Sequence, residues 1–181
     1  MTRYVAFLRA VNVGGHATLK MESLRRAFMA LGFENVRTLL ASGNVVFEAG
    51  EPAAAGEAMT ARIEGHLRDK LGLGTMVMLR TRREIEKLVQ RDPFGDEASG
   101  RAIEYYVAFL ARKPKAGYDL PIVSAKDGLE LFSVEGREAF LIRRRVIGRY
   151  GSPNDLIEAK LGVAATFRNW NTVLKIGGHH T

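Results

Sequence analysis

Arg9-Ala-Val-Asn-Val-Gly-Gly-His-Ala-Thr-Leu-Lys-Met21 is the stretch from which the fold of this chain can be worked out. It follows the apolar segment Tyr4–Leu8, which lacks polar alternation, as expected for a strand that is covered on both faces. Beyond it, apolar side chains recur at helical spacing, at Met21, Leu24, Phe28 and Leu31. The quoted stretch is therefore predicted to be a loop that leads from a strand into a helix.

The rest of the first half completes an order of β-α-β-β-α-β. The Ser42-Gly43 pair is typical of a hairpin link. The expected elements around it are strands at Val36–Ala41 and Asn44–Glu48, a helix at Ala53–Leu71 and a strand at Thr75–Leu79. This order predicts an α+β fold in which residues 1–80 form a ferredoxin-like unit, with two helices on one face of an antiparallel sheet.

Residues 81–181 are predicted to form a second, less complete ferredoxin-like unit that shares one core with the first. A capping box at Thr81–Glu84 begins its first helix. The other expected elements are a strand at Ile103–Ala111, a hairpin of Leu129–Val134 and Glu138–Ile142, a helix from Ser152-Pro153 to Gly162, and a last helix at Phe167–Lys175. The helix between the first two strands of a ferredoxin-like unit is missing or degraded here.

The composition excludes several classes of function. The 181 residues contain no cysteine, which excludes disulfides, thiolate zinc sites and cysteine nucleophiles. The four histidines are not spaced as ligands, and we expect neither a metal nor a cofactor. No apolar run approaches the ~20 residues that cross a bilayer, and no signal peptide is recognised at the N-terminus. We therefore expect a cytoplasmic protein without a membrane partner.

The strand-to-helix loop is the first candidate site. Its expected ligand-binding residues are Arg9, Asn12, Gly14, Gly15 and Lys20. Backbone amides at a glycine pair, a helix N-terminus and two cationic side chains together suit a phosphate or a carboxylate. The spacing matches neither a Walker motif nor a dinucleotide fingerprint, so no nucleotide is implied. The alternative is a tight turn that only returns the chain into its helix.

The segment Arg168–Thr172 is the second candidate, with Arg168 and Asn171 as expected ligand-binding residues. One interpretation is a second wall of the same site, in which Trp170 offers an aromatic platform beside amide and guanidinium donors. The favoured interpretation for Trp170 itself is structural. A sole tryptophan more often anchors packing, and Asn169 and Asn171 would then satisfy backbone groups.

Several separated blocks of the chain resemble a bacterial family, domain of unknown function 1697. The blocks are Arg9-Ala-Val-Asn-Val-Gly-Gly15, Lys20-Met21, Leu31-Gly-Phe33, Ala41-Ser-Gly-Asn-Val-Val-Phe47, Glu158-Ala-Lys-Leu-Gly162 and Ala165-Thr-Phe-Arg-Asn-Trp-Asn-Thr-Val173. The family's usual Arg-Gly-Ile-Asn reads Arg-Ala-Val-Asn here, which removes one glycine. The resemblance implies a two-part α+β fold built from ferredoxin-like units, and it implies no established reaction.

Three functions are compatible with these features. The leading one is a binding protein for a small anionic or phosphorylated ligand at Arg9–Lys20. The net charge of +7 leaves open a nucleic-acid-binding module, whose basic surface would include Arg143–Arg145 with Arg137 and Arg149. The third is an enzyme acting on a phosphorylated metabolite, for which no general base stands out. A Ser42 nucleophile is rejected because no nucleophile-elbow pattern surrounds it.

Overall fold

The structure is a computed structural model, and it describes residues 1–11, 19–52, 56–95, 103–144 and 152–178. The chain divides into two compact units, Met1–Ile85 and Glu86–Thr181. None of the helices within the described ranges is long and apolar enough to cross a membrane.

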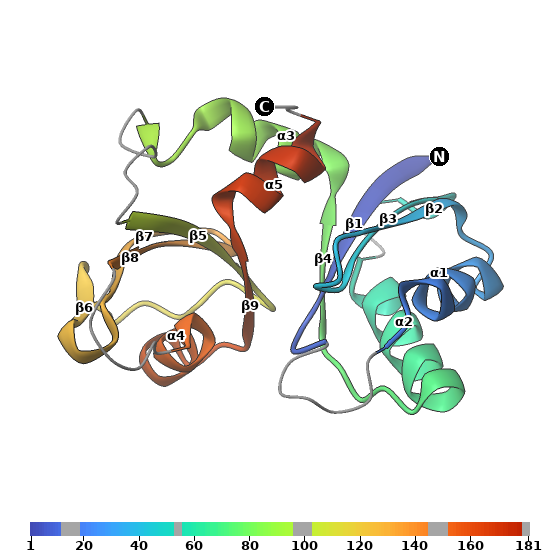
Figure 1. The fold of residues 1–181 in the computed structure, drawn as a ribbon, viewed down its shortest axis with the longest axis horizontal. Coiled ribbons are helices and arrows are strands. Elements are labelled where there is room, and N and C mark those ends of the chain that lie inside the picture. The colour runs from blue at the N-terminus through green and yellow to red at the C-terminus, as the bar shows by residue number, and fades with distance from the viewer. Residues whose placement is uncertain (12–18, 53–55, 96–102, 145–151, 179–181) are drawn as a thin grey trace. The chain divides into compact units, whose positions relative to one another are not determined.

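The first unit is a four-stranded antiparallel sheet with the strand order β2-β3-β1-β4. Helices α1 and α2 lie on one face of this sheet (Figure 1). The predicted element order is confirmed, with the bounds β1 Thr2–Leu8, α1 Met21–Ala30, β2 Glu34–Leu39, β3 Asn44–Ala49, α2 Gly56–Leu71 and β4 Val77–Thr81.

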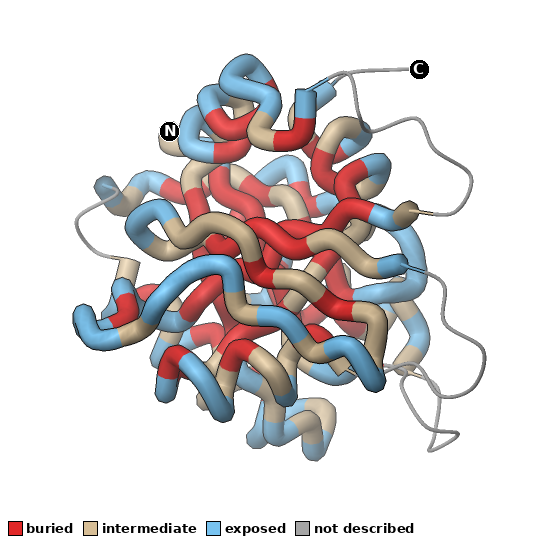
Figure 2. The backbone as a smooth tube through the Cα atoms, turned by 90° about the vertical axis from the view of Figure 1, so that its left-hand side faces the viewer, coloured by how far each residue is buried: buried red, intermediate tan, exposed pale blue. Residues whose placement is uncertain are grey.

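The core of the first unit is aromatic. The ring of Phe47 on β3 lies 4.4 Å from Phe33, 5.3 Å from Phe28 and 5.6 Å from Tyr4, measured between ring centroids. Helical side chains such as Leu24 close this core from above the sheet. Residues of β1 are buried on both faces, as its unbroken apolar sequence predicted. Buried residues lie mainly along the strands, as Figure 2 shows.

The link between β2 and β3 differs from the predicted two-residue turn. Strand β2 ends at Leu39, so the turn runs from Leu40 to Gly43. Leu40 has a φ of +61° and Gly43 a φ of +71°, which are left-handed conformations. The buried side chain of Asn44 holds the turn, because its Nδ2 donates to the Leu39 carbonyl and to Ser42 Oγ, both at 2.9 Å.

Edge strand β2 carries a bulge. Its register against β3 shifts between Glu34 and Arg37, and Asn35 within the bulge has a φ of +49°. The Asn35 side chain donates from Nδ2 to Glu48 Oε2 on β3 at 2.8 Å. This bond ties the bulged backbone to the neighbouring strand.

The predicted capping box begins α3, which spans Arg82–Arg91. The Thr81 amide donates to Glu84 Oε2 at 2.6 Å, and the Glu84 amide donates to Thr81 Oγ1 at 3.2 Å. The two side chains thus satisfy each other's backbone donors, and α3 follows β4 without a loop.

The second unit is a five-stranded antiparallel sheet with the order β6-β7-β8-β5-β9. Strands β7-β8-β5-β9 repeat the spatial order β2-β3-β1-β4 of the first unit. The chain between β5 and β7 forms a short strand and a 3₁₀ turn instead of a helix. The bounds are β5 Ile103–Leu110, β6 Ile122–Ser124, the 3₁₀ turn Ala125–Asp127, β7 Leu129–Glu135, β8 Glu138–Arg144, α4 Pro153–Leu161, β9 Ala165–Asn169 and α5 Trp170–Gly177.

Most predicted elements of this unit are confirmed. The predicted β7–β8 hairpin is present, with Gly136 and Arg137 in its turn, and α4 is preceded by Ser152 and ended by Gly162 in a left-handed conformation. Strand β6 was not expected. The predicted helix Phe167–Lys175 is wrong in its first turn, because the chain from Ala165 to Asn169 is strand β9, which pairs with β5.

Two layers cover the sheet of the second unit. Helix α4 packs on one face through Ile157 and Leu161, against Tyr106 and Leu141 of the sheet. On the other face Trp170, the first residue of α5, places its ring centroid 5.1 Å from that of Phe94. Gly177 near the end of α5 lies so close to α3 that an added Cβ would stand 2.9 Å from Val89 Cγ2.

Candidate functional site

The backbone at the start of the Arg9–Lys20 segment is fixed to both neighbouring strands. The Leu8 amide donates to the Gly43 carbonyl and the Arg9 amide to the Met76 carbonyl, both at 2.9 Å. Thr75 Oγ1 donates to the Arg9 carbonyl at 2.7 Å. Ala10 then has a left-handed φ of +53°, and Val11 after it is buried in the core of the first unit. The segment therefore leaves the sheet from a well-defined point.

The side chain of Arg9 is half-buried beside Met76. Its Nη1 lies 4.0 Å from the Met76 sulfur, which is a long and weak hydrogen bond to a thioether. Asn12, Gly14 and Gly15 lie outside the described residues, so their part in the site stays a prediction.

Lys20 stands at the N-cap position of α1, and its side chain is exposed. Its carbonyl accepts from the Ser23 amide at 3.0 Å and from the Leu24 amide at 3.2 Å. The Lys20 side chain does not cap the helix. It therefore carries a positive charge at the end of α1 where the helix dipole is also positive.

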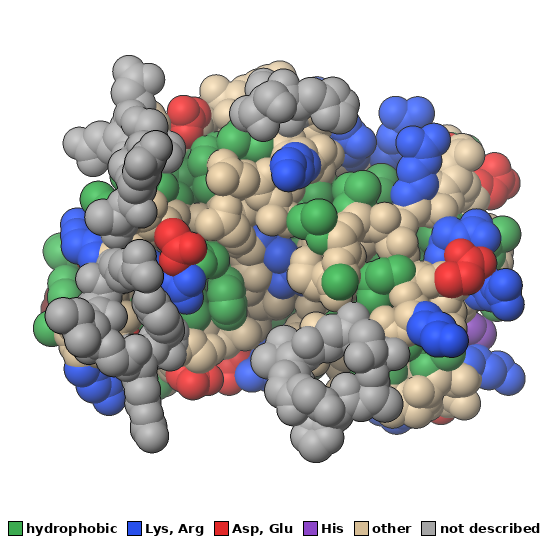
Figure 3. All heavy atoms as spheres, viewed as in Figure 1, with side chains coloured by type: hydrophobic (Ala, Val, Ile, Leu, Met, Phe, Trp, Pro, Cys, Tyr) green, Lys and Arg blue, Asp and Glu red, His purple; other side chains and the backbone are tan. Residues whose placement is uncertain are grey.

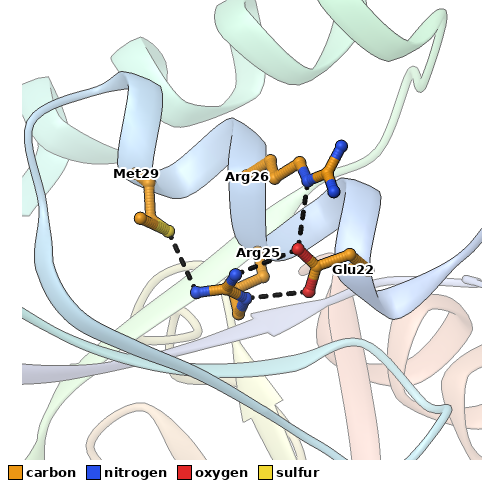
Figure 4. Close-up of polar contacts among 4 residues, drawn as sticks. All are labelled: Glu22, Arg25, Arg26 and Met29. Atoms are coloured by element: carbon orange, nitrogen blue, oxygen red, sulfur yellow. Dashed lines mark hydrogen bonds and ion pairs between the residues drawn. The ribbon is translucent and has the colours of Figure 1, made fainter.

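The acidic residue in the first turn of α1 is neutralised by its own helix. Glu22 accepts hydrogen bonds from Arg25 Nε and Nη2, each at 2.9 Å, and from Arg26 Nε at 3.0 Å (Figure 4). These bonds lower the pKa of Glu22 to about 2. Arg25 also donates from Nη1 to the Met29 sulfur at 3.1 Å. Lys20, Arg25 and Arg26 against one carboxylate leave this helix face with excess positive charge.

Arg168 lies in the second unit and is 7% exposed. Its Nη1 donates to Thr166 Oγ1 and to the Phe167 carbonyl, both at 2.8 Å. Burial lowers the pKa of Arg168 to about 10, because the charged guanidinium has lost much of its hydration. The guanidinium is thus held against its own strand, and its role as a ligand contact stays a prediction.

Asn171 is exposed in the first turn of α5, and its backbone amide donates to Asn169 Oδ1 at 3.0 Å. Asn169 is thereby the N-cap of α5. The buried ring of Trp170 packs on Phe94, so the structural interpretation of Trp170 and Asn169 accounts for both residues. A ligand contact by Asn171 stays a prediction.

The basic run Arg143–Arg145 is partly compensated by acids. Arg143 donates from Nε and Nη2 to Glu104 Oε2 at 2.7 and 2.5 Å, and its guanidinium carbon lies 4.9 Å from the Tyr106 ring centroid. Arg144 pairs with Glu130 at 2.5 Å. On the face shown in Figure 3, acidic side chains are interspersed among the basic ones. Arg145 and Arg149 lie outside the described residues.

No pattern in the sequence points to Thr75 and Met76, the two residues that contact Arg9. Thr75 falls in the predicted strand Thr75–Leu79, whereas β4 begins at Val77, and Met76 carries no chemical signal in a sequence. Only the pairing of β1 with β4, Leu8 opposite Val77, brings the two residues to Arg9. Within the ranges that the structure describes, no group of three or more His, Asp and Glu side chains could hold a metal ion.

Comparison with known proteins gives the fold and a family. The conserved bacterial protein SP0830 from Streptococcus pneumoniae has a solved structure that is similar over 98% of both chains, with a TM-score of 0.63 and 20% sequence identity. At this identity the likeness concerns the fold alone. No curated protein matches the chain. The family model described as "Protein of unknown function (DUF1697)" matches residues 1–140, and the chain belongs to that family.

Proposed function

We propose that this protein binds a small anion, a phosphate or a carboxylate carried by a metabolite, at the Arg9–Lys20 segment. The observation that supports the proposal is that the segment has a cationic residue at each end and that the backbone at its first residue, Arg9, is held in place. Arg9 and Lys20 stand at the two ends of a segment that contains no Asp or Glu. The backbone of Arg9 is held by Thr75 and Met76, so its position is set before a ligand arrives.

The first turn of α1 strengthens this argument. An uncompensated carboxylate at Glu22 would repel an anion, but Arg25 and Arg26 bind both of its oxygens. Lys20 therefore acts at a helix N-terminus whose neighbouring acid is already paired. Together with the dipole of α1, this arrangement favours a negative charge at the start of the helix.

The chemistry is that of binding and orientation. Arg9 would supply a planar donor pair and Lys20 a point charge, while the predicted amides of Gly14 and Gly15 would fix the geometry of the anion. A cytoplasmic location belongs to the proposal, because a chain without cysteine is suited to a reducing compartment.

The test is a titration of the full chain with inorganic phosphate at low salt. Binding is measured by calorimetry and by the shifts of amide NMR signals. We expect saturable binding of one phosphate. The affinity should fall about tenfold or more in Lys20→Ala and in Arg9→Gln, since each removes a charge-assisted contact. Lys70→Ala is the matched control, because Lys70 is an exposed lysine in the last turn of α2. Phosphate affinity that is equal in all four proteins, or absent in the parent chain, would overturn the proposal.

A titration with an oligonucleotide at several salt concentrations separates this proposal from a nucleic-acid interface. A surface of many phosphate contacts predicts that the affinity for an oligonucleotide falls steeply with salt and tolerates single substitutions. A site at Arg9–Lys20 predicts the opposite, a shallow salt dependence and a large effect of one residue.

A further inference from the structure

Methionine is the only oxidisable sulfur residue in this chain, because cysteine is absent. Two methionines are sequestered in the structure, Met59 at 2% and Met78 at 1% exposed. Apart from the N-terminal Met1, the exposed methionines are Met29, at 48%, and Met76, at 39%. Peroxides reach exposed thioethers first, so Met29 and Met76 are the expected targets.

Both exposed methionines have an arginine beside the sulfur. Arg25 Nη1 lies 3.1 Å from the Met29 sulfur, and Arg9 Nη1 lies 4.0 Å from the Met76 sulfur. A thioether is a weak acceptor, so these contacts contribute little in the reduced protein. A sulfoxide carries a polar oxygen on the same sulfur, and a guanidinium donates strongly to such an oxygen.

The backbone around Met76 makes this pairing specific. The Met76 carbonyl accepts from the Arg9 amide at 2.9 Å, and the neighbouring Thr75 Oγ1 binds the Arg9 carbonyl at 2.7 Å. The backbones of the two residues are therefore held side by side, just beyond the paired ends of β1 (Leu8) and β4 (Val77). An oxygen added to the Met76 sulfur on the side of Arg9 would lie between that sulfur and the guanidinium, whose Nη1 is 4.0 Å away.

We propose that Met76 is a reversible oxidation site whose sulfoxide binds the Arg9 guanidinium and thereby weakens anion binding at the Arg9–Lys20 segment. The effect on anions rests on the function proposed above. The oxidant is a peroxide: the sulfur lone pair takes the terminal oxygen, the O–O bond breaks, and water leaves when the peroxide is hydrogen peroxide. A methionine sulfoxide reductase, which takes two electrons from a thiol reductant, removes the sulfoxide oxygen as water and restores the thioether.

Met29 provides an internal control, because it is also exposed, at 48%, and lies against an arginine on α1. We compare two full-length variants, Met29→Leu and Met76→Leu, before and after hydrogen peroxide, with each sulfoxide located by peptide mass spectrometry. Oxidation should lower phosphate affinity about tenfold in Met29→Leu, as expected for one lost charge-assisted contact, and leave Met76→Leu unchanged. Treatment with a methionine sulfoxide reductase should restore the affinity. Failure of Met76 to oxidise, or equal affinities before and after oxidation, would overturn the inference.

A second readout does not depend on phosphate. The fall in melting temperature on oxidation is measured in Met29→Leu and in Met29→Leu/Arg9→Gln. We expect a smaller fall when Arg9 is present, because the sulfoxide then gains a donor. Equal falls would refute the Met76–Arg9 contact, even if the untreated protein bound no phosphate and the proposed function had failed on its own.

Discussion

The carbonyl oxygen of Gly43 accepts a hydrogen bond from the Leu8 amide at 2.9 Å, and a Cβ added to Gly43 would stand 3.0 Å from the Leu8 Cβ. The same Cβ would lie 3.2 Å from the side chain of Val11. Close approach and a left-handed φ of +71° thus both require glycine at this turn. The β2–β3 turn therefore packs directly against the end of β1, where the Arg9–Lys20 segment begins.

Gly43→Ala should destabilise the protein. A left-handed alanine costs about 1–2 kcal/mol, and crowding against Leu8 and Val11 adds about 1–3 kcal/mol to the loss in free energy of unfolding. Gly72→Ala is the matched control, because Gly72 has a φ of +62° but nothing within 4 Å of an added Cβ. Urea denaturation measures both. Equal losses in the two variants would show that crowding at Gly43 is unimportant.

Leu40→Asn should stabilise the protein. Leu40 holds a φ of +61° with an exposed side chain, a conformation that asparagine adopts more readily than leucine. We expect a gain of about 0.5–1 kcal/mol in the free energy of unfolding, which is part of the left-handed penalty. Leu39→Asn, one residue earlier in β2 and half-buried, should instead destabilise. Thermal melts decide the matter, and a lower melting temperature for Leu40→Asn would contradict the prediction.

Glu22→Gln should lower the melting temperature near neutral pH and not at strongly acid pH. The folded protein holds the pKa of Glu22 at about 2, below its ordinary value of 4.5, so the ionised form favours folding. The stabilisation is present above pH 4.5 and is lost as the pH falls through about 2. Melts of both proteins from pH 7 to pH 2 test this. Glu57→Gln, in the first turn of α2, is the matched control and should show a smaller difference in melting temperature at pH 7.

Arg168 and Thr166 should show non-additive effects. Arg168→Met removes the bond to Thr166 Oγ1 and the bond to the Phe167 carbonyl, at a cost of about 1–3 kcal/mol in the free energy of unfolding. In Arg168→Met/Thr166→Val the hydroxyl that lost its donor is absent as well, so the double variant should cost less than the sum of the two single ones. Chemical denaturation of the four proteins gives the coupling, and strict additivity would refute it.

The order of helices and strands was largely predictable because its signals are local. Thr81 and Glu84 form the predicted capping box, and Gly162 ends α4 as predicted. Strand β9 was not recognised, because Arg168 is a buried cation on a strand and no hydropathy pattern assigns such a residue to a core. Strand β6 spans only Ile122–Ser124, too short a run to show alternation.

The candidate site was less predictable, for reasons of sequence distance. The side chains that meet Arg9 come from Thr75 and Met76, and strand pairing alone brings them there. Arg143 appeared to be part of a basic strip, but the register of β5 and β8 places Glu104 directly opposite. The sequence alone does not identify the residue opposite Arg143 on the neighbouring strand. It was therefore not possible to predict that the charge of Arg143 is compensated by an acid.

The bulge between Glu34 and Arg37 has a consequence for how this protein behaves at high concentration. Strand β2 is an edge of its sheet, and an open edge can recruit a strand of another molecule. The left-handed Asn35 breaks the regular row of backbone donors and acceptors, and the same edge strand carries charged residues at Glu34 and Arg37. An incoming strand could pair with only part of this edge, which disfavours fibrous self-association through the first unit.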